Sequence, residues 1–94
     1  MTQEEQKAIL RELQKIPNIG PACAKDLLLL GIYSSADLKD RDADGLYQEL
    51  CAKTGARQDP CVWDTFAAAV HYAKTGEARK WWDFTEERKA TRQL

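Results

Sequence analysis

The chain has 94 residues with a formal net charge of −1, a length that suits one domain. Hydrophobic residues make up 44% of it, as in an ordinary globular protein, and no apolar run approaches the ~20 residues of a membrane-spanning helix. Dedicated non-specific DNA binders are usually basic, so this charge argues against strong autonomous DNA binding. Residues 1–5 are polar and acidic, unlike a secretory signal, so we expect a cytoplasmic protein without membrane contact.

The first predicted helix covers residues 2–16. Thr2 and Glu5 have the spacing of a capping box. Apolar residues follow at helical spacing: Ile9, Leu13 and Ile16. Pro17 cannot continue this helix, which must therefore end before it.

A short turn separates the first helix from the second, predicted over residues 21–30. Asn18 and Gly20 are residue types that tolerate positive φ, and Pro21 suits the first position of a helix. Gly31 ends the second helix. The turn should therefore present free backbone N–H groups at a helix N-terminus, which is a favourable site for an anion.

Three more helices follow. Ser34 or Ser35 can cap a short helix that runs through Leu38 and Lys39. Asp42 can cap a helix that reaches Thr54 and stops at Gly55. Asp59 and Pro60 are typical of a helix start, and that helix should end at Gly76.

The C-terminal part begins with three aromatic residues within four positions: Trp81, Trp82 and Phe84. Such a cluster does not stay fully exposed, so we expect it to fold over the helical core. The alternative is that it buries the surface of a partner, as in a homodimer. Thr85–Glu87 is a candidate start for a last short helix, and the polar residues from about Arg88 to Leu94 are candidates for a disordered tail.

The chemically reactive candidates are Cys23, Cys51, Cys61 and His71. No two cysteines form a C-x-x-C pair, so a zinc knuckle is not indicated, and we expect three free thiols, at least two of them largely buried. Cys61 follows a predicted helix start, where the thiolate form is favoured. A Cys51–Cys61 redox pair or a metal site with His71 stays an alternative. No catalytic constellation appears, so we expect a non-enzyme without metal or cofactor.

Residues 13–32 resemble the helix-hairpin-helix motif of DNA-binding proteins. The matching positions are Ile16, Pro17, Ile19, Gly20, Ala24, Leu27 and Leu30-Gly31-Ile32. Two positions depart from the motif: Asn18 replaces its first glycine, and Ala22 replaces a lysine that often binds phosphate. The resemblance implies sequence-independent binding of duplex DNA. The residues that it places at the DNA are Lys15, Asn18, Ile19, Gly20, Ala22, Cys23 and Lys25.

The same resemblance implies a fold for the whole chain. Residues 35–39 and 43–54 look like the degenerate second helical pair that commonly packs against such a motif. We therefore expect one all-α domain over residues 1–94, a compact bundle of about five helices.

The chain also resembles the pathogenicity locus family of small bacterial proteins, sometimes labelled mitomycin resistance proteins. The resemblance rests on motifs in a set order: Leu50-Cys51, Asp59-x-Cys61-Val62, Ala69-Val70-His71-Tyr72-Ala73 and Lys80-Trp81-Trp82. It implies the helical architecture but no specific activity. DNA binding is thus the leading functional hypothesis. A protein-interaction module comes second and a cysteine-based redox or metal role third.

Overall fold

The computed structural model describes residues 2–91, and in this part of the chain it contains helices and no strand. Its elements are α1 (Gln3–Leu13), α2 (Pro21–Leu29), the 3-10 helix η1 (Ser35–Leu38), α3 (Ala43–Thr54), α4 (Pro60–Thr75), the 3-10 helix η2 (Trp81–Phe84) and α5 (Thr85–Thr91). The prediction of an all-α chain is confirmed. No helix among these residues is both long and apolar enough to cross a lipid bilayer.

The helix ends follow the capping residues of the sequence. The Thr2 hydroxyl accepts a hydrogen bond from the Glu5 N–H at the start of α1. The side chains of Asp42 and Asp59 accept from the first turns of α3 and α4. Both helices end at glycines in the left-handed region, which carry no side chain to strain there: Gly55 and Gly76.

The first helix is shorter than predicted. It ends at Leu13, and residues 14–16 continue in a tighter turn, in which the Lys15 and Ile16 N–H groups donate to the carbonyls of Glu12 and Leu13, three positions back. Helix ends often tighten in this way before a residue that cannot be helical, here Pro17.

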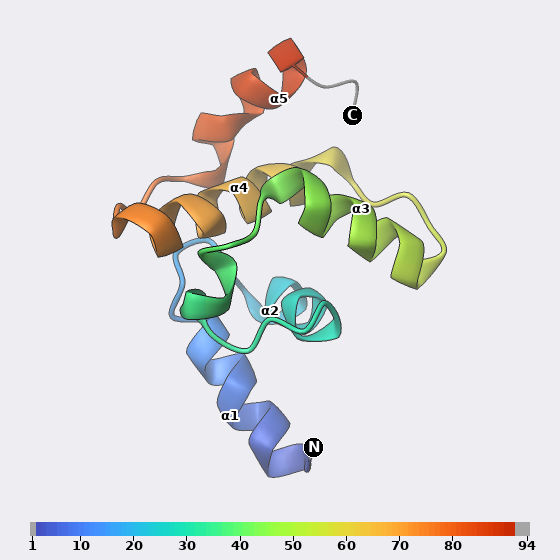
Figure 1. Cartoon of the computed structure of the whole chain (residues 1–94), viewed down its shortest axis with the longest axis vertical. Helices are drawn as coiled ribbons and strands as arrows, with labels where there is room; N and C mark the ends of the chain where they lie inside the picture. The colour runs from blue at the N-terminus through green and yellow to red at the C-terminus, as the bar shows by residue number, and fades with distance from the viewer. Residues whose placement is uncertain (1, 92–94) are drawn as a thin grey trace.

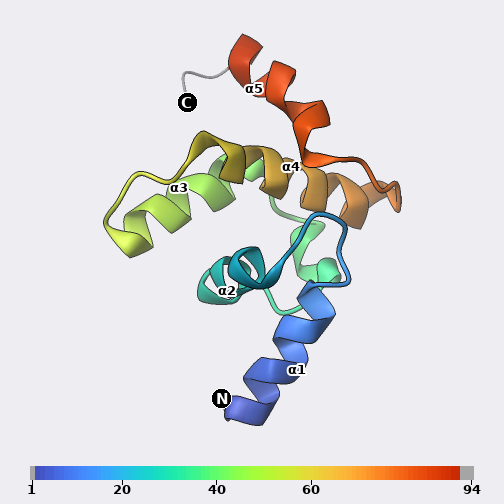
Figure 2. The same cartoon turned by 180° about the vertical axis from the view of Figure 1, so that it is seen from behind.

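Helix α4 is the centre of the molecule. It packs against α3, η1, η2 and α5, while α1 packs against α2 (Figure 1). The view from behind shows the same order, with α1 and α5 at opposite ends and α4 between them (Figure 2). The inward face of α4 carries the fully buried Phe66 and the small Ala68 and Ala69, which let neighbouring segments approach closely.

Both members of the predicted second helical pair pack mainly against α4. Its first member, residues 35–39, is only the four-residue 3-10 helix η1, and it packs against α4. Its second member, α3, pairs with α4 as well. The reason is size, because η1 buries a single apolar side chain, Leu38, whereas the 16 residues of α4 offer a continuous apolar face.

The C-terminal segment closes the core of the same chain. Phe84 is buried in the core and Trp81 packs against it, while Trp82 remains 53% exposed. The predicted folding of the aromatic cluster over the helices is therefore confirmed for Trp81 and Phe84.

A buried ion pair holds α5 against α4. The carboxylate of Asp64 is fully buried; it accepts hydrogen bonds from Nε of Arg88 at 2.8 Å and from the Thr85 hydroxyl at 2.8 Å. Arg88 is itself only 6% exposed. The candidate disordered tail from Arg88 is thus wrong for residues 88–91, which belong to α5, and residues 92–94 lie outside the described part.

Candidate nucleic-acid interface

The turn between α1 and α2 is held by two buried isoleucines, Ile16 and Ile19. The N–H of Ile19 donates to the carbonyl of Ile16 at 3.1 Å. The side chain of Ile19 is in the core and its N–H already has an acceptor. Ile19 therefore shapes the turn, and the expectation that it also contacts DNA stays a prediction.

Asn18 connects the turn to a distant segment. It has the one positive φ among the non-glycine residues described, 73°. Its side-chain Nδ2 donates to the carbonyl of Arg79 at 2.6 Å, and its Oδ1 accepts from the N–H of Trp81 at 3.3 Å. Because both ends of the amide are engaged, Asn18 holds the turn against residues 79–81, and its expected contact with DNA stays a prediction.

The N-terminus of α2 is open. Gly20 is the N-cap residue, with no side chain to cap the helix, and a Cβ placed on it would meet no atom within 4 Å. Pro21 has no N–H, so the first-turn donors of this helix are those of Ala22 and Cys23. The N–H of Ala24 already closes the helix onto the carbonyl of Gly20 at 2.9 Å.

The thiol of Cys23 adds no negative charge at this N-terminus. Its side chain is half-buried, and this burial, followed by the charge of nearby Asp26, raises its pKa, while a hydrogen bond from the backbone of Gly20 partly offsets the rise. The group is therefore a neutral thiol at neutral pH.

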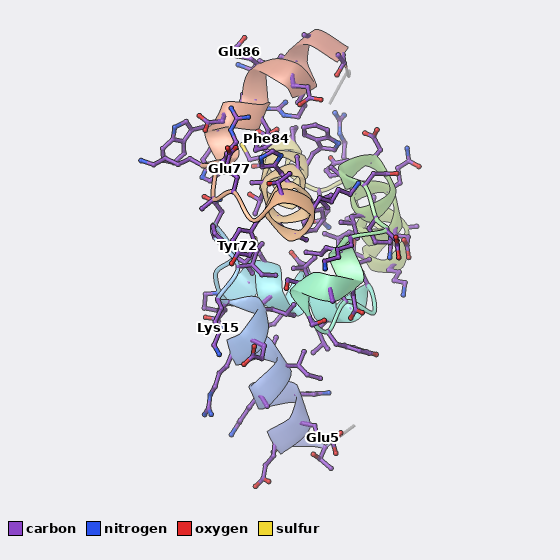
Figure 3. The ribbon with its side chains drawn as sticks, turned by 60° about the vertical axis from the view of Figure 1, so that its left-hand side comes forward. Glu5, Lys15, Tyr72, Glu77, Phe84 and Glu86 are labelled. Carbon is purple, nitrogen blue, oxygen red and sulfur yellow. The ribbon has the colours of Figure 1, made fainter. Side chains whose placement is uncertain are left out.

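Four cations lie on or beside the segments that form the turn, and two of them, Lys15 and Arg79, have acidic neighbours. Lys15 pairs with Glu12 at 2.8 Å and Arg79 lies within 4 Å of both Glu77 and Asp83. Lys25 is exposed, and Lys80 lies over the ring of Trp82. Figure 3 shows Lys15, Tyr72 and Glu77 following one another along one side of the molecule.

Sequence reasoning missed Arg79 and Lys80, which are more than 60 positions from Asn18. The one available signal was Asn18 itself, since an amide replaces the glycine of the motif and an amide can bond in two directions.

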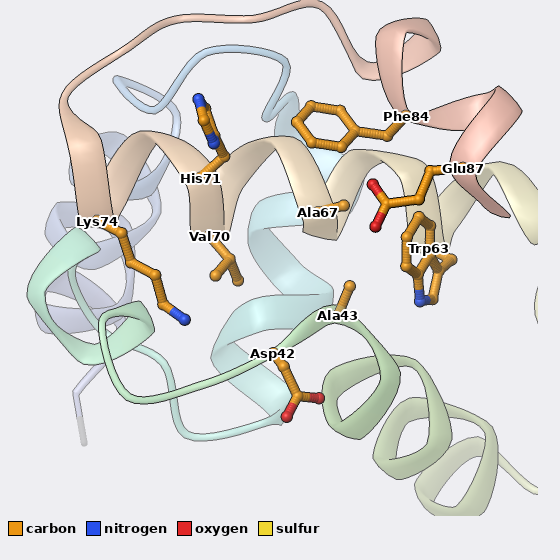
Figure 4. A pocket seen from close by; sticks show the side chains of 9 residues that line it. All are labelled: Asp42, Ala43, Trp63, Ala67, Val70, His71, Lys74, Phe84 and Glu87. Atoms are coloured by element: carbon orange, nitrogen blue, oxygen red, sulfur yellow. The ribbon is translucent and has the colours of Figure 1, made fainter. Parts of the chain in front are cut away.

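Surface hollows border both the turn and helix α4. One, of about 230 Å³, lies beside Lys15 and is also lined by the hydroxyl residues Ser34 and Ser35. The other, of about 260 Å³, lies between α4, the start of α3 and the C-terminal segment (Figure 4). Its floor is apolar, with Trp63 and Phe84, while acidic and basic side chains share its rim.

The cysteines do not form a site. All three are free thiols; Cys23 and Cys51 are partly buried and pack against the core, as predicted for at least two of them, while Cys61 is exposed. Partial burial and then the carboxylate of Asp59 raise the pKa of Cys61, which corrects the expectation of a favoured thiolate. Within residues 2–91 no group of three side chains could hold a metal ion.

Comparison with known proteins gives two matches. The sequence model of a family described as "Pathogenicity locus" matches residues 6–90. The "Mitomycin resistance protein McrB" of Streptomyces lavendulae is 41% identical over 78 residues, which cover 83% of this chain and 74% of that protein. No solved structure matches the chain.

Proposed function

The chain belongs to the pathogenicity locus family, and we propose that it serves as a non-enzymatic DNA-binding module that holds the phosphate backbone at the N-terminus of α2. The family's description and the relative's name specify no binding partner, so the proposal rests on the residues of the α1–α2 turn. In it, α1, the turn and α2 form a helix-hairpin-helix motif that contacts duplex DNA without reading its sequence.

The proposal rests on how the N-termini of the helices are capped. The N-termini of α1, α3 and α4 each carry a side chain that accepts from a first-turn N–H, and in α3 and α4 that side chain is an aspartate. The N-terminus of α2 has no such cap and has open space in front of Gly20. Backbone donors and the helix dipole there favour an anion, and a DNA phosphate fits both.

The surrounding charges support weak binding. Lys15 and Arg79 share their charge with acidic neighbours, so Lys25 and Lys80 supply most of the positive field. Ala22 stands where the motif often has a lysine. Few phosphate contacts mean low affinity and a shallow dependence on salt, since each contact contributes about 0.9 to the slope.

Two variants of the same size test the phosphate contact. Gly20→Glu places a carboxylate where the phosphate would lie, whereas Gly20→Gln has nearly the same shape without the charge. The φ of Gly20 is −90° and its surroundings are open, so both variants should fold. In a low-salt gel shift with a blunt duplex, we expect Gly20→Glu to abolish binding and Gly20→Gln to weaken it only modestly.

A gain of affinity provides the complementary test. Ala22 is exposed at the start of α2, and Ala22→Lys adds a cation beside the proposed phosphate. We expect tighter binding and a salt slope steeper by about 0.9. Equal binding by the Gly20 variants and the parent, together with no effect of Ala22→Lys, would remove the α2 N-terminus from the binding site.

A second candidate is a protein-interaction module, and the exposed Trp82 favours it. In that case the partner, which includes a second copy of this chain, would cover the indole. Light scattering over a range of concentrations, on the parent and on Trp82→Ala, distinguishes a self-associating surface from a free one.

A further inference from the structure

We propose that Trp82 stacks on an unpaired base, so that the preferred ligand is DNA in which a single strand adjoins a duplex. The inference rests on the proposed function, since the phosphate contact at α2 would hold the duplex while Trp82 engages the strand beside it. Each step follows from contacts around the turn.

Trp82 belongs to a segment that is bonded to the turn before α2. The two hydrogen bonds of Asn18, to the carbonyl of Arg79 and from the N–H of Trp81, join the backbone of residues 79–81 to the turn. Gly20 is two residues beyond Asn18 in one direction, and Trp82 is one residue beyond Trp81 in the other. The open helix N-terminus and the exposed indole are therefore each within two residues of one hydrogen-bonded junction.

The side chain of Trp82 is exposed. Among the exposed large apolar side chains of residues 2–91 it has the largest exposed fraction, 53%, against 48% for Leu29 and 46% for Tyr33. Trp81 lies edge-on to it, with ring centroids 5.5 Å apart and an interplanar angle of 85°, and Trp81 packs on the core. An exposed aromatic ring with a partly buried neighbour that packs on the core offers a base a stacking surface that does not depend on sequence.

A positive charge accompanies the ring of Trp82. Nζ of Lys80 lies 5.0 Å from the centre of the Trp82 ring, and Lys80 belongs to none of the ion pairs found among residues 2–91. The carboxylate of the adjacent Asp83 is near Arg79, at 3.6 Å. The ammonium group of Lys80 lies over one face of the indole, and a base would stack on the other face or displace the ammonium group. A cation at a stacking ring matches a nucleotide, which has both a base and a phosphate, better than it matches an apolar protein surface.

The experiment measures binding by fluorescence anisotropy with three labelled DNAs: a blunt duplex, the same duplex with a short oligothymidine overhang, and the overhang strand alone. The parent should bind the overhang duplex at least about five-fold more tightly than the blunt one. Trp82→Ala should lose this preference and keep its affinity for the blunt duplex. Tyr33→Ala, which removes another exposed aromatic, should behave like the parent.

A second readout follows the indole directly. Oligothymidine should quench part of the tryptophan fluorescence of the parent, and Trp82→Phe should remove that quenching while keeping part of the overhang preference. Circular dichroism checks that each variant is folded.

The outcomes separate the two proposals. An absence of overhang preference in the parent, or an unchanged preference in Trp82→Ala, overturns the stacking inference while duplex binding stands. A parent that binds none of the three DNAs overturns the proposed function together with it. A dimer that dissociates in Trp82→Ala also overturns the stacking inference, because the indole then belongs to an interface between copies.

Discussion

At the scale of single residues, Asp59 has two effects that oppose the chemistry expected at a helix start. Its carboxylate accepts the N–H of Cys61 at 2.9 Å and so caps α4. The same backbone hydrogen bond, first among several causes, lowers the pKa of Asp59. After partial burial, the hydrogen bond between Asp59 and the Cys61 thiol, and then the charge of Asp59, raise the pKa of that thiol. A helix N-terminus usually favours a thiolate, but here the neighbouring carboxylate favours the protonated thiol.

The corresponding prediction concerns Asp59→Asn. Asparagine caps a helix as well as aspartate does, so the fold should persist, but the charge that raises the pKa of Cys61 is gone. The pKa of Cys61 should fall, the thiolate fraction at pH 8 should rise, and alkylation of Cys61 should accelerate.

Mass spectrometry of iodoacetamide-treated protein can follow Cys61 separately from Cys23 and Cys51. The rates of the variant and the parent should converge at high pH, where both thiols are ionised. Asp40→Asn, which removes an exposed carboxylate from the loop between η1 and α3, is the control. Identical pH–rate curves for Asp59→Asn and the parent would contradict the role assigned to this carboxylate.

At the scale of elements, α5 shows what holds a seven-residue helix in place. A helix of this length is not stable by itself, so its contacts must supply the stability. Those contacts are Phe84 just before it and the ion pair of Arg88 with the fully buried Asp64. The hydrogen bond with Asp64, its largest cause, raises the pKa of Arg88 further above its ordinary value, so the guanidinium remains charged at every working pH.

The second prediction tests this pair. Arg88→Met keeps an apolar stem but leaves the buried carboxylate of Asp64 without its guanidinium, and should lower the free energy of unfolding by about 3–5 kcal/mol. Adding Asp64→Asn removes the unpaired charge while retaining a group that can bond to Thr85. The double variant should therefore be more stable than Arg88→Met alone.

Urea denaturation followed by circular dichroism measures these differences. Lys89→Met, at the exposed neighbouring position, should change the free energy of unfolding by no more than about 0.5 kcal/mol. The assignment fails if Arg88→Met resembles Lys89→Met, or if Asp64→Asn deepens the loss.

The elements also show which features were predictable. The starts of α3 and α4 and their glycine ends follow from Asp42, Asp59, Gly55 and Gly76, because caps act within a few residues. The position of Arg88 was not predictable in this way. A run of polar residues gives no local sign that one of them meets a buried carboxylate 24 positions earlier.

At the scale of the whole molecule, Asn18 joins the N-terminal hairpin to the C-terminal segment across 61 and 63 positions of sequence. From sequence, Asn18 was a tolerable replacement for glycine and a candidate phosphate contact. Its hydrogen-bond partners in the fold could not be predicted from sequence. Both are backbone groups, and every non-proline residue has the same backbone N–H and carbonyl, whatever its side chain. The openness of the α2 N-terminus, in contrast, follows from Gly20 and Pro21 alone.

The third prediction separates the conformation of Asn18 from its hydrogen bonds. Asn18→Gly accepts a φ of 73° without strain but loses both bonds, so the free energy of unfolding should fall by about 1–2 kcal/mol. Asn18→Ala loses the bonds and adds the cost of the left-handed region, so the fall should reach about 2–3 kcal/mol.

Chemical denaturation of the two variants and the parent gives the comparison. If Asn18→Gly is as stable as the parent, the bonds to residues 79 and 81 contribute nothing. If Asn18→Gly and Asn18→Ala lower the free energy of unfolding by the same amount, the positive φ at this position is not a source of strain.

The central place of α4 has a consequence for the order of events during synthesis. On the ribosome, α1 and α2 emerge first, and their buried leucines and isoleucines belong to the same core as Phe66 and Phe84, which are translated later. Until α4 and η2 have left the exit tunnel, α1 and α2 can pack against each other, but the rest of their shared core is not yet present. The nascent hairpin is therefore exposed to proteases and chaperones for the several seconds that translation of the remaining residues takes at about 5–20 residues per second.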